Sequence, residues 1–188
     1  GGENSFGSYL AYHHPTQLGT DLSWTSVGVG WSHSCGIKAD DSLWCWGHQY
    51  GTGRSSNLPT PVQLGVGQQW KKVKGGNVHT CALRFDNTLW CLGVNTNGQL
   101  GIDSTTTIRT SLVQESTTST WDTYSTGYEH TCAVRTDGTL WCWGGNDYGQ
   151  LGISNTTSQI SPIQVGTDTD WANVGAGKYH SCGRKTNG

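Results

Sequence analysis

The sequence contains no methionine, and only 13% of its 188 residues are charged, with a formal net charge of −2. A nucleic-acid-binding surface needs clustered lysine and arginine, so this charge balance excludes that class of partner. No apolar run approaches the roughly 20 residues of a membrane span, and no signal peptide is visible. Apolar residues at helical spacing are equally scarce, so we predict an all-β protein. Because the sequence starts at Gly1 and lacks methionine, we expect a processed form or part of a longer protein.

Glycine and tryptophan, by contrast, are abundant, and the tryptophans mark an internal repeat. The phrase W-x-x-[V/Y]-x-x-G-x-x-H-[S/T]-C occurs four times, beginning at Trp24, Trp70, Trp121 and Trp171. A tandem repeat of about 50 residues is typical of β-propellers and solenoids. We therefore predict a single domain over residues 1–188. Its repeat units are approximately 1–46, 47–92, 93–143 and 144–188, the last of them incomplete.

Each unit contains a predicted β-hairpin with a cysteine in each arm. The clearest copy is HTCAVRTDGTLWCWG, His130–Gly144, and the last copy stops at its turn. A three-residue turn closes the hairpin, and its last position needs a residue that tolerates a positive φ. The four copies have Asp41, Asn87, Gly138 and Gly188 there. Counting outward from this turn places the two cysteines opposite each other at a non-hydrogen-bonded pair. The Cα atoms of such a pair are about 4.5 Å apart, which is within disulfide range.

Seven cysteines could serve disulfides, a metal ion or reactive thiols. No C-x-x-C pair is present, which makes a structural zinc site the weaker alternative. We therefore predict three disulfides and leave Cys182 unpaired within this chain. The predicted pairs are Cys35 with Cys45, Cys81 with Cys91, and Cys132 with Cys142. Paired cysteines indicate an oxidising compartment, so we predict a secreted or cell-surface protein.

Alternation along the strands gives every hairpin two apolar faces, and both need to be covered. Blades stacked around an axis cover both faces, whereas a sheet with one solvent-exposed face does not. We therefore predict a β-propeller of four-stranded antiparallel blades, forming part of a larger propeller or one that another subunit completes. Arg184 departs from the pattern, because the other copies have Ile37, Leu83 and Val134 at its position. An arginine on that face indicates an edge or a contact with something outside this chain.

These phrases resemble the repeats of the regulator-of-chromosome-condensation family of β-propellers. The resemblance rests on the recurring G-x-N-x-x-G-Q-L-G, G-x-x-H-[S/T]-C-A-[L/V] and D-G-T-L-W phrases and on the closing W-G, and it covers essentially the whole chain. It implies a propeller, usually seven-bladed in this family, and the paired cysteines resemble the family's secreted bacterial branch. Because the family includes nucleotide exchange factors, β-lactamase inhibitors and ultraviolet sensors, the resemblance implies no single activity.

Four histidines occupy equivalent repeat positions, namely His33, His79, His130 and His180. We favour the interpretation that each bonds to a neighbouring loop as part of the repeat consensus. The alternative is a ring of imidazoles around the axis that binds a metal ion. Most tryptophans also occupy repeat positions and are predicted to pack in the core. Trp31 is the exception, and it stands where the other copies have Asn77, Tyr128 and Lys178.

No motif for catalysis is present, because the sequence lacks G-x-S-x-G and a nucleotide-binding loop with its lysine. We therefore predict an extracellular non-enzymatic protein, without cofactor or metal, that acts through protein binding or self-association. The alternatives are a structural subunit of a surface layer, sheath or filament, and a glycan-binding module. The candidate interaction residues are Trp31, Arg184 and the Ser/Thr-rich segment Ser104–Thr120, which we predict to be an exposed loop or edge strand.

Overall fold

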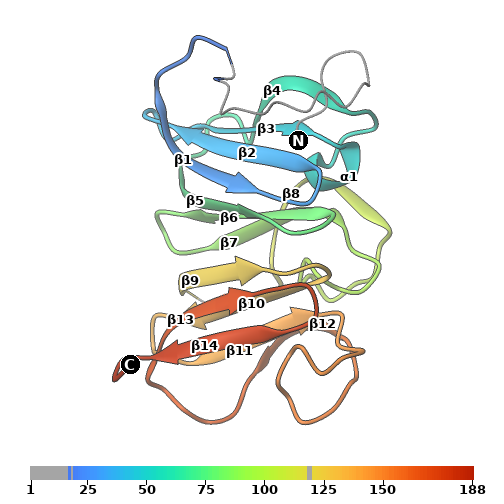
Figure 1. Cartoon of the computed structure of the whole chain (residues 1–188), viewed down its shortest axis with the longest axis vertical. Coiled ribbons are helices and arrows are strands. Elements are labelled where there is room, and N and C mark those ends of the chain that lie inside the picture. Colours follow the sequence, from blue (N-terminus) through green and yellow to red (C-terminus); the bar gives the residue numbers. More distant parts are fainter. Residues whose placement is uncertain (1–16, 18, 118–119) are drawn as a thin grey trace.

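The computed structural model describes residue 17 and residues 19–117 and 120–188, and its regular secondary structure is β-strand apart from one four-residue helix. The structure contains three four-stranded antiparallel sheets and one two-stranded sheet. The three complete sheets follow one another along the long axis of the molecule, and the two-stranded sheet overlaps the third sheet in this view (Figure 1). The all-β prediction is therefore confirmed. Residues 1–16, 18 and 118–119 lie outside the described residues; they include part of the first predicted unit and part of the segment Ser104–Thr120.

The strands are short, and their boundaries follow the repeat. The first sheet contains β1 Trp24–Val29, β2 His33–Lys38, β3 Leu43–Gly47 and β4 Leu58–Leu64. The second contains β5 Trp70–Gly75, β6 His79–Arg84, β7 Leu89–Val94 and β8 Ile108–Gln114. The third contains β9 Trp121–Thr126, β10 His130–Arg135, β11 Leu140–Gly144 and β12 Gln159–Gln164. The fourth contains β13 Trp171–Ala176 and β14 Ser181–Lys185, and the single helix of the described residues is α1 Gln49–Thr52.

Each sheet begins at a repeat tryptophan, and the strands of the three complete sheets cross the boundary between two of the predicted sequence units. The first sheet runs from Trp24 to Leu64, whereas the first unit ends at residue 46. The repeat length is the same in both descriptions, and only the starting point differs. A blade is therefore built from the second half of one sequence unit and the first half of the next.

The hairpin register agrees with the one counted from the turn. In β10 and β11 Cys132 lies opposite Cys142, and the N–H of Arg135 donates to the carbonyl of Thr139 at 2.9 Å. The last turn residues Asp41, Asn87, Gly138 and Gly188 all have positive φ. The three predicted disulfides are present, with Cα atoms 4.0 to 4.1 Å apart. The conformation of the local turn thus accounts for the pairing of the two cysteines within each hairpin.

The fourth strand of each complete sheet lies at its outer edge. β4 and β12 contain prolines, which cannot donate to a sheet ladder and are therefore confined to edges. β8 covers residues 108–114 of the Ser/Thr-rich segment, so this part of Ser104–Thr120 is an edge strand and the described residues around it form loops. The prediction of a loop or edge strand is confirmed for the described part of that segment.

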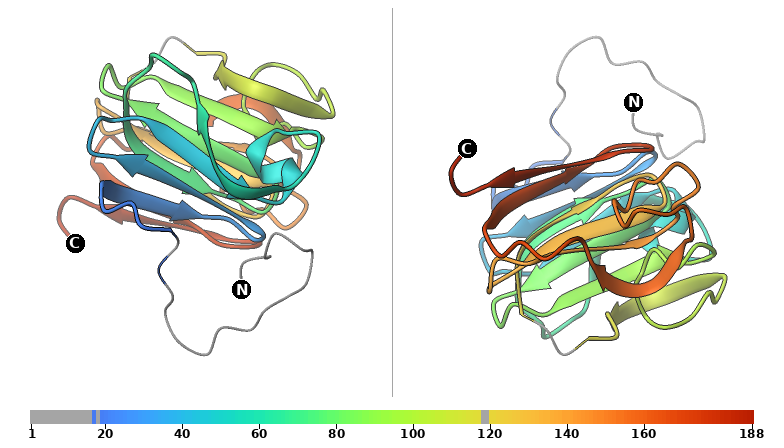
Figure 2. Two further views of the ribbon diagram at one scale, coloured as in Figure 1. Left: turned by 90° about the horizontal axis from the view of Figure 1, so that it is seen from above. Right: turned by 90° about the horizontal axis from the view of Figure 1, so that it is seen from below.

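The hydrophobic core lies between successive sheets. Between the first two sheets, Ile37 and Leu43 of one pack with Trp70, Val73 and Leu92 of the next. Equivalent clusters fill the two following interfaces. Viewed along the long axis, the sheets overlie one another (Figure 2), and the first strands β1, β5, β9 and β13 of neighbouring blades are in contact. Both faces of an inner blade are covered, as their apolar alternation requires.

Among the described residues, α1 is only four residues long, and no helix there could cross a membrane.

Candidate functional site

The candidate site forms where the first strand of each blade ends and turns into the second. In every copy the glycine of G-x-x-H donates its N–H to the carbonyl of the histidine three residues later, at 2.8 to 2.9 Å. A side chain at this glycine is excluded, because a Cβ there would occupy the same space as the histidine ring of the same turn. The four turn glycines are Gly30, Gly76, Gly127 and Gly177. The repeat sequence therefore builds the same tight, side-chain-free turn four times.

The histidine of each turn connects its own blade to the next one. The ring Nε2 of His33 lies 2.8 Å from Thr80 Oγ1, and that of His79 lies 3.1 Å from Thr131 Oγ1. His130 Nε2 lies 2.9 Å from Ser181 Oγ in the same way. These hydroxyls belong to strands β6, β10 and β14, so our prediction of a bond to a neighbouring loop needs a correction. The partner is a strand hydroxyl, because the histidine crosses the gap between stacked sheets.

The hydrogen bonds that the threonine hydroxyls donate define the protonation state of the histidine rings. Thr80 donates to the carbonyl of Gly51 at 2.7 Å, and Thr131 donates to that of Gln99 at 3.0 Å. Each hydroxyl therefore accepts from its histidine, which carries its proton on Nε2. Burial lowers the pKa of His33 and of His130 to about 4 and that of His79 to about 3. These rings are neutral at physiological pH and serve as structural links between blades.

The metal-binding alternative for these histidines finds no support in the geometry. Among residues 19–117 and 120–188, no three histidine, cysteine or acidic side chains are grouped as a metal site would need. His180 differs from the other three because its ring is exposed, and no following blade in the described chain offers it a hydroxyl.

The four turns together form a groove, which we call the axial groove. It is lined by three consecutive residues from each blade, 29–31, 75–77, 126–128 and 176–178, and it encloses about 270 Å³. Backbone hydrogen bonds connect its walls: Trp31 N–H donates to Gly76 O at 3.1 Å, and Tyr128 N–H donates to Gly177 O at 3.2 Å. The walls of the groove are therefore joined by the main chains of neighbouring blades.

Trp31 and Tyr128 line this groove, and Tyr179 and Tyr148 continue the aromatic cluster beside it. Trp31 is 74% exposed, and its ring meets that of Tyr128 edge-on at 6.2 Å between centroids. Tyr128 is 6.1 Å from Tyr179, and Tyr179 is 4.3 Å from Tyr148. The ammonium of Lys178 lies 4.9 Å from the ring centroids of both Tyr128 and Tyr179. The arrangement offers aromatic faces, a cation and backbone carbonyls, which suits non-covalent recognition.

The sequence predicted Trp31 as a surface residue but did not predict the cluster around it. Tyr128 and Lys178 share the repeat position of Trp31, so the variation at that one position was the available signal. Tyr179 follows Lys178, and Tyr148 comes from a Gly-rich turn. The contact between these tyrosines depends on how the third and fourth blades pack, which a single repeat does not encode.

Arg184 does not line the axial groove. It is an exposed residue of β14 and lines a second depression of about 310 Å³, together with residues 173–175, 182 and 183. Cys182 is exposed and unpaired in the same depression. The structure therefore does not bring Trp31 and Arg184 together, and the two candidate interaction residues belong to different surfaces.

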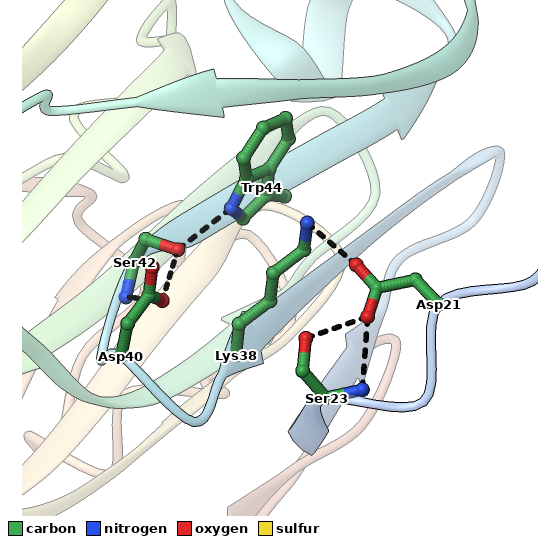
Figure 3. Close-up of polar contacts among 6 residues, drawn as sticks. All are labelled: Asp21, Ser23, Lys38, Asp40, Ser42 and Trp44. Atoms are coloured by element: carbon green, nitrogen blue, oxygen red, sulfur yellow. Dashed lines mark hydrogen bonds and ion pairs between the residues drawn. The ribbon is translucent and has the colours of Figure 1, made fainter.

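A polar network stabilises the hairpin turn between β2 and β3, which lies at the other end of β2 from its G-x-x-H turn. Figure 3 shows the side chains of this network. Asp40 accepts hydrogen bonds from the backbone N–H and the hydroxyl of Ser42, whose oxygen accepts from Trp44 Nε1 at 2.7 Å. Lys38 lies 3.9 Å above the Trp44 ring and pairs with Asp21 at 2.7 Å. The hydrogen bonds from Ser42 lower the pKa of Asp40. The same Asp–hydroxyl–Trp arrangement recurs at residues 86–90 and 137–141.

Comparison with known proteins identifies the repeat and the fold. Residues 24–56, 70–99 and 125–150 match the Regulator of chromosome condensation (RCC1) repeat. Human WBSCR16 superposes with a TM-score of 0.81 at 21% identity, over 93% of this chain and 48% of that chain.

Two yeast structures show the same likeness. Prp20p from Saccharomyces cerevisiae, described with its binding to Gsp1p and histones, gives a TM-score of 0.77 at 16% identity, over 87% of this chain and 44% of that one. Yeast RCC1 (Prp20) with Kap60 bound gives a TM-score of 0.79 at 20% identity, over 91% of this chain and 44% of that one. The chain thus spans just under half the length of these three proteins. The sheets are blades of a β-propeller, and the chain contains RCC1 repeats.

Proposed function

We propose that the protein is a non-catalytic extracellular binding protein whose axial groove holds a protein partner. One observation carries the proposal: the residues at the position of Trp31 differ between all four repeats, yet they meet at a single groove. Asn77, Tyr128 and Lys178 are the other three. The glycine and histidine of the same turns are invariant across the copies because they build the fold. The variable position is therefore the one free to determine what is bound.

The chemistry of the groove indicates the kind of partner segment. Exposed tryptophan and tyrosine rings are the residue types that most often dominate the binding energy of protein interfaces. Lys178 adds a positive charge next to Tyr128 and Tyr179. A partner segment with an apolar or aromatic side chain followed by a carboxylate would complement this surface.

Two further observations support the proposal. Three disulfides in one small domain are typical of proteins from oxidising compartments, which favours a secreted or cell-surface location. The structurally similar Prp20p is described as binding Gsp1p and histones, and yeast RCC1 is described in complex with Kap60. These are partners of proteins that share only the fold, so they support a binding role for this chain and not the same partners.

Selection from a displayed peptide library tests the proposal. The immobilised protein is used for capture, and a variant with Trp31→Ala and Tyr128→Ala, both lining the groove, is used to remove peptides that bind elsewhere. We expect enriched peptides with an aromatic residue near an acidic one, and at least a tenfold weaker affinity for the variant, which corresponds to about 1.4 kcal/mol. Peptides that bind both proteins equally would contradict an interaction through the groove.

A glycan is the second candidate ligand, because the indole of Trp31 is 74% exposed and free to stack on a sugar ring. A glycan array probed with the same two proteins separates the alternatives. Binding of a sugar that depends on Trp31, without any peptide selected, would replace the protein-binding proposal with a glycan-binding one.

A further inference from the structure

Two tyrosines from different blades lie in contact beside the axial groove. Tyr148 belongs to the Gly-rich turn that follows β11, and Tyr179 belongs to the G-x-x-H turn that precedes β14. Their ring centroids are 4.3 Å apart, and the ring planes are inclined at 34°. The distance from Tyr179 to Tyr128 is longer, at 6.1 Å. The third and fourth blades therefore bring two phenol rings together.

Both phenols are open to solvent. Tyr148 is 67% exposed and Tyr179 is 41% exposed, and no group among the described residues forms a hydrogen bond with either phenolic oxygen. Tyr124 differs from them, because it is fully buried and its hydroxyl donates to Cys81 O at 2.7 Å. An oxidant can therefore take the hydroxyl hydrogens of Tyr148 and Tyr179 without breaking an internal hydrogen bond.

The contact lies at a junction between blades, where the repeat places the same two turn positions each time. Between the second and third blades these positions are Asn97 and Glu129. A Cβ on Gly145 would lie 3.5 Å from that of Glu129 and 3.7 Å from that of Asn97. Both side chains are nevertheless only half-buried. The chain that follows the third strand of a blade therefore leaves this junction accessible to solvent.

The residue types at this junction are specific to the third and fourth blades. The repeat needs the glycine and histidine of the G-x-x-H turn, but it accepts Glu129 as well as Tyr179 between them. It likewise accepts Asn97 as well as Tyr148 in the Gly-rich turn. The fold thus does not require tyrosine at either position. Only the combination of the two tyrosines gives the junction a chemistry of its own.

We propose that Tyr148 and Tyr179 form an oxidative cross-linking site, at which a peroxidase-type oxidant joins the two rings and fixes the third blade to the fourth. The short distance between the exposed rings favours coupling within one molecule over coupling between molecules. The inference concerns the junction between blades, so it does not depend on the binding role proposed for Trp31.

The reaction balances with hydrogen peroxide as the oxidant. Each phenol loses the hydrogen atom of its O–H bond and becomes a phenoxyl radical. The two radicals form a carbon–carbon bond between the ring positions next to the oxygens, and the hydrogen atoms at those carbons then move to the oxygens and restore both phenols. The peroxide accepts the two hydrogen atoms that were removed, its oxygen–oxygen bond breaks, and two water molecules form.

Sulfur-containing side chains offer little competition for the oxidant. The chain contains no methionine, and six of its cysteines form disulfides. Cys182 is the exposed thiol, and thiols are readily oxidised by peroxide. The experiments therefore use the Cys182→Ser protein, which also prevents disulfide-linked dimers.

The first experiment treats the dilute Cys182→Ser protein with a haem peroxidase and a limiting amount of hydrogen peroxide. We expect the fluorescence of dityrosine in the monomer fraction. Proteolysis should release a cross-linked pair of peptides that contain residues 148 and 179, and its mass should be lower than the sum of the two by two hydrogen atoms. Cross-links between molecules only, or a link from Tyr179 to Tyr128 instead, would overturn the proposal.

Two phenylalanine variants provide matched controls. Tyr148→Phe removes one phenol of the pair and should abolish the cross-link in the monomer. Tyr50 is also exposed, at 45%, but its ring neighbour is His48, 4.9 Å away. Tyr50→Phe should therefore keep the full yield. Equal yields in the two variants would show that the cross-link does not need the Tyr148–Tyr179 contact.

The second experiment measures what the bond does to stability. A cross-link between residues 148 and 179 constrains the unfolded chain in the way that a disulfide does. The midpoint of guanidinium denaturation should therefore rise when the Cys182→Ser protein is cross-linked, whereas treated Tyr148→Phe protein should keep its midpoint. An unchanged midpoint after complete cross-linking would contradict the proposal that the bond fixes the third blade to the fourth.

Discussion

His79 Nε2 lies 3.1 Å from Thr131 Oγ1, so the imidazole of the second blade donates to a hydroxyl on the second strand of the third. Both residues are fully buried. The equivalent bonds from His33 and His130 make this the standard connection between neighbouring blades. The connection needs a neutral ring, because the buried Nδ1 atoms of these histidines have no hydrogen-bond partner for a second proton.

The first prediction is that stability falls on mild acidification. Burial lowers the pKa of His33 and His130 from 6.5 to about 4, and that of His79 from 6.5 to about 3. Between pH 6.5 and 4 the unfolded chain therefore binds protons that the folded chain does not. The free energy of unfolding should decrease by up to about 1.4 kcal/mol per pH unit for each of the three histidines. Urea denaturation at a series of pH values measures this slope.

A single variant isolates one histidine in this slope. His79→Gln removes the titrating group, and its slope between pH 6.5 and 4 should be smaller than that of the wild type by up to about 1.4 kcal/mol per pH unit. Acidic residues influence both proteins equally and cancel in the difference. An unchanged slope in His79→Gln would mean that the buried imidazole does not control the acid response.

The second prediction concerns the hydroxyl itself. Thr131→Val keeps the shape of the side chain but removes the acceptor of His79 and the donor to Gln99. Leaving a buried donor unsatisfied costs about 1–3 kcal/mol. Thr105→Val is the matched control, because Thr105 is exposed and such surface changes usually stay within about 0.5 kcal/mol. Equal denaturation midpoints for the two variants would contradict a structural role of the hydroxyl.

The third prediction concerns the disulfides. Replacing both Cys81 and Cys91 with alanine opens a loop with a sequence separation of 10 residues, and the unfolded chain gains freedom worth about 2–3 kcal/mol. Guanidinium denaturation should show a loss of this size. The exposed Cys182 closes no loop, so Cys182→Ser should leave the midpoint nearly unchanged. A similar loss in both proteins would mean that cysteine removal acts through something other than the cross-link.

Features determined by a few neighbouring residues could be predicted from the sequence. The turn glycines, asparagine and aspartates and the ten-residue spacing of the cysteines determine the hairpin register, so the pairs Cys35–Cys45 and Cys132–Cys142 followed from counting. The outer strands were harder to predict, because β4 and β12 carry prolines and polar residues and pair along one edge only. Such strands have no strong alternation of their own.

Features that depend on the contact between blades could not be derived from one repeat. The partner of His79 is separated from it by 52 residues in sequence, and only the stacking distance between sheets brings the hydroxyl within reach. The aromatic cluster at the axial groove has the same origin, since Trp31 meets Tyr128 from two blades away. Repeat periodicity indicates that blades stack, but it does not specify which side chains then meet.

The last prediction compares the effect on stability of alanine at two glycines, one in the turn after β9 and one in strand β13. Gly127 belongs to the G-x-x-H turn, and a Cβ there would coincide with the His130 ring and lie 2.7 Å from the carbonyl oxygen of Gly177. Gly127→Ala should therefore displace the ring from Ser181 and destabilise the protein by about 1–3 kcal/mol or more. Gly175 has nothing within 4 Å of its Cβ position, and alanine in a strand is not disfavoured relative to glycine. Thermal unfolding of both variants checks this contrast, and a larger loss for Gly175→Ala than for Gly127→Ala would contradict the packing of histidine against the turn.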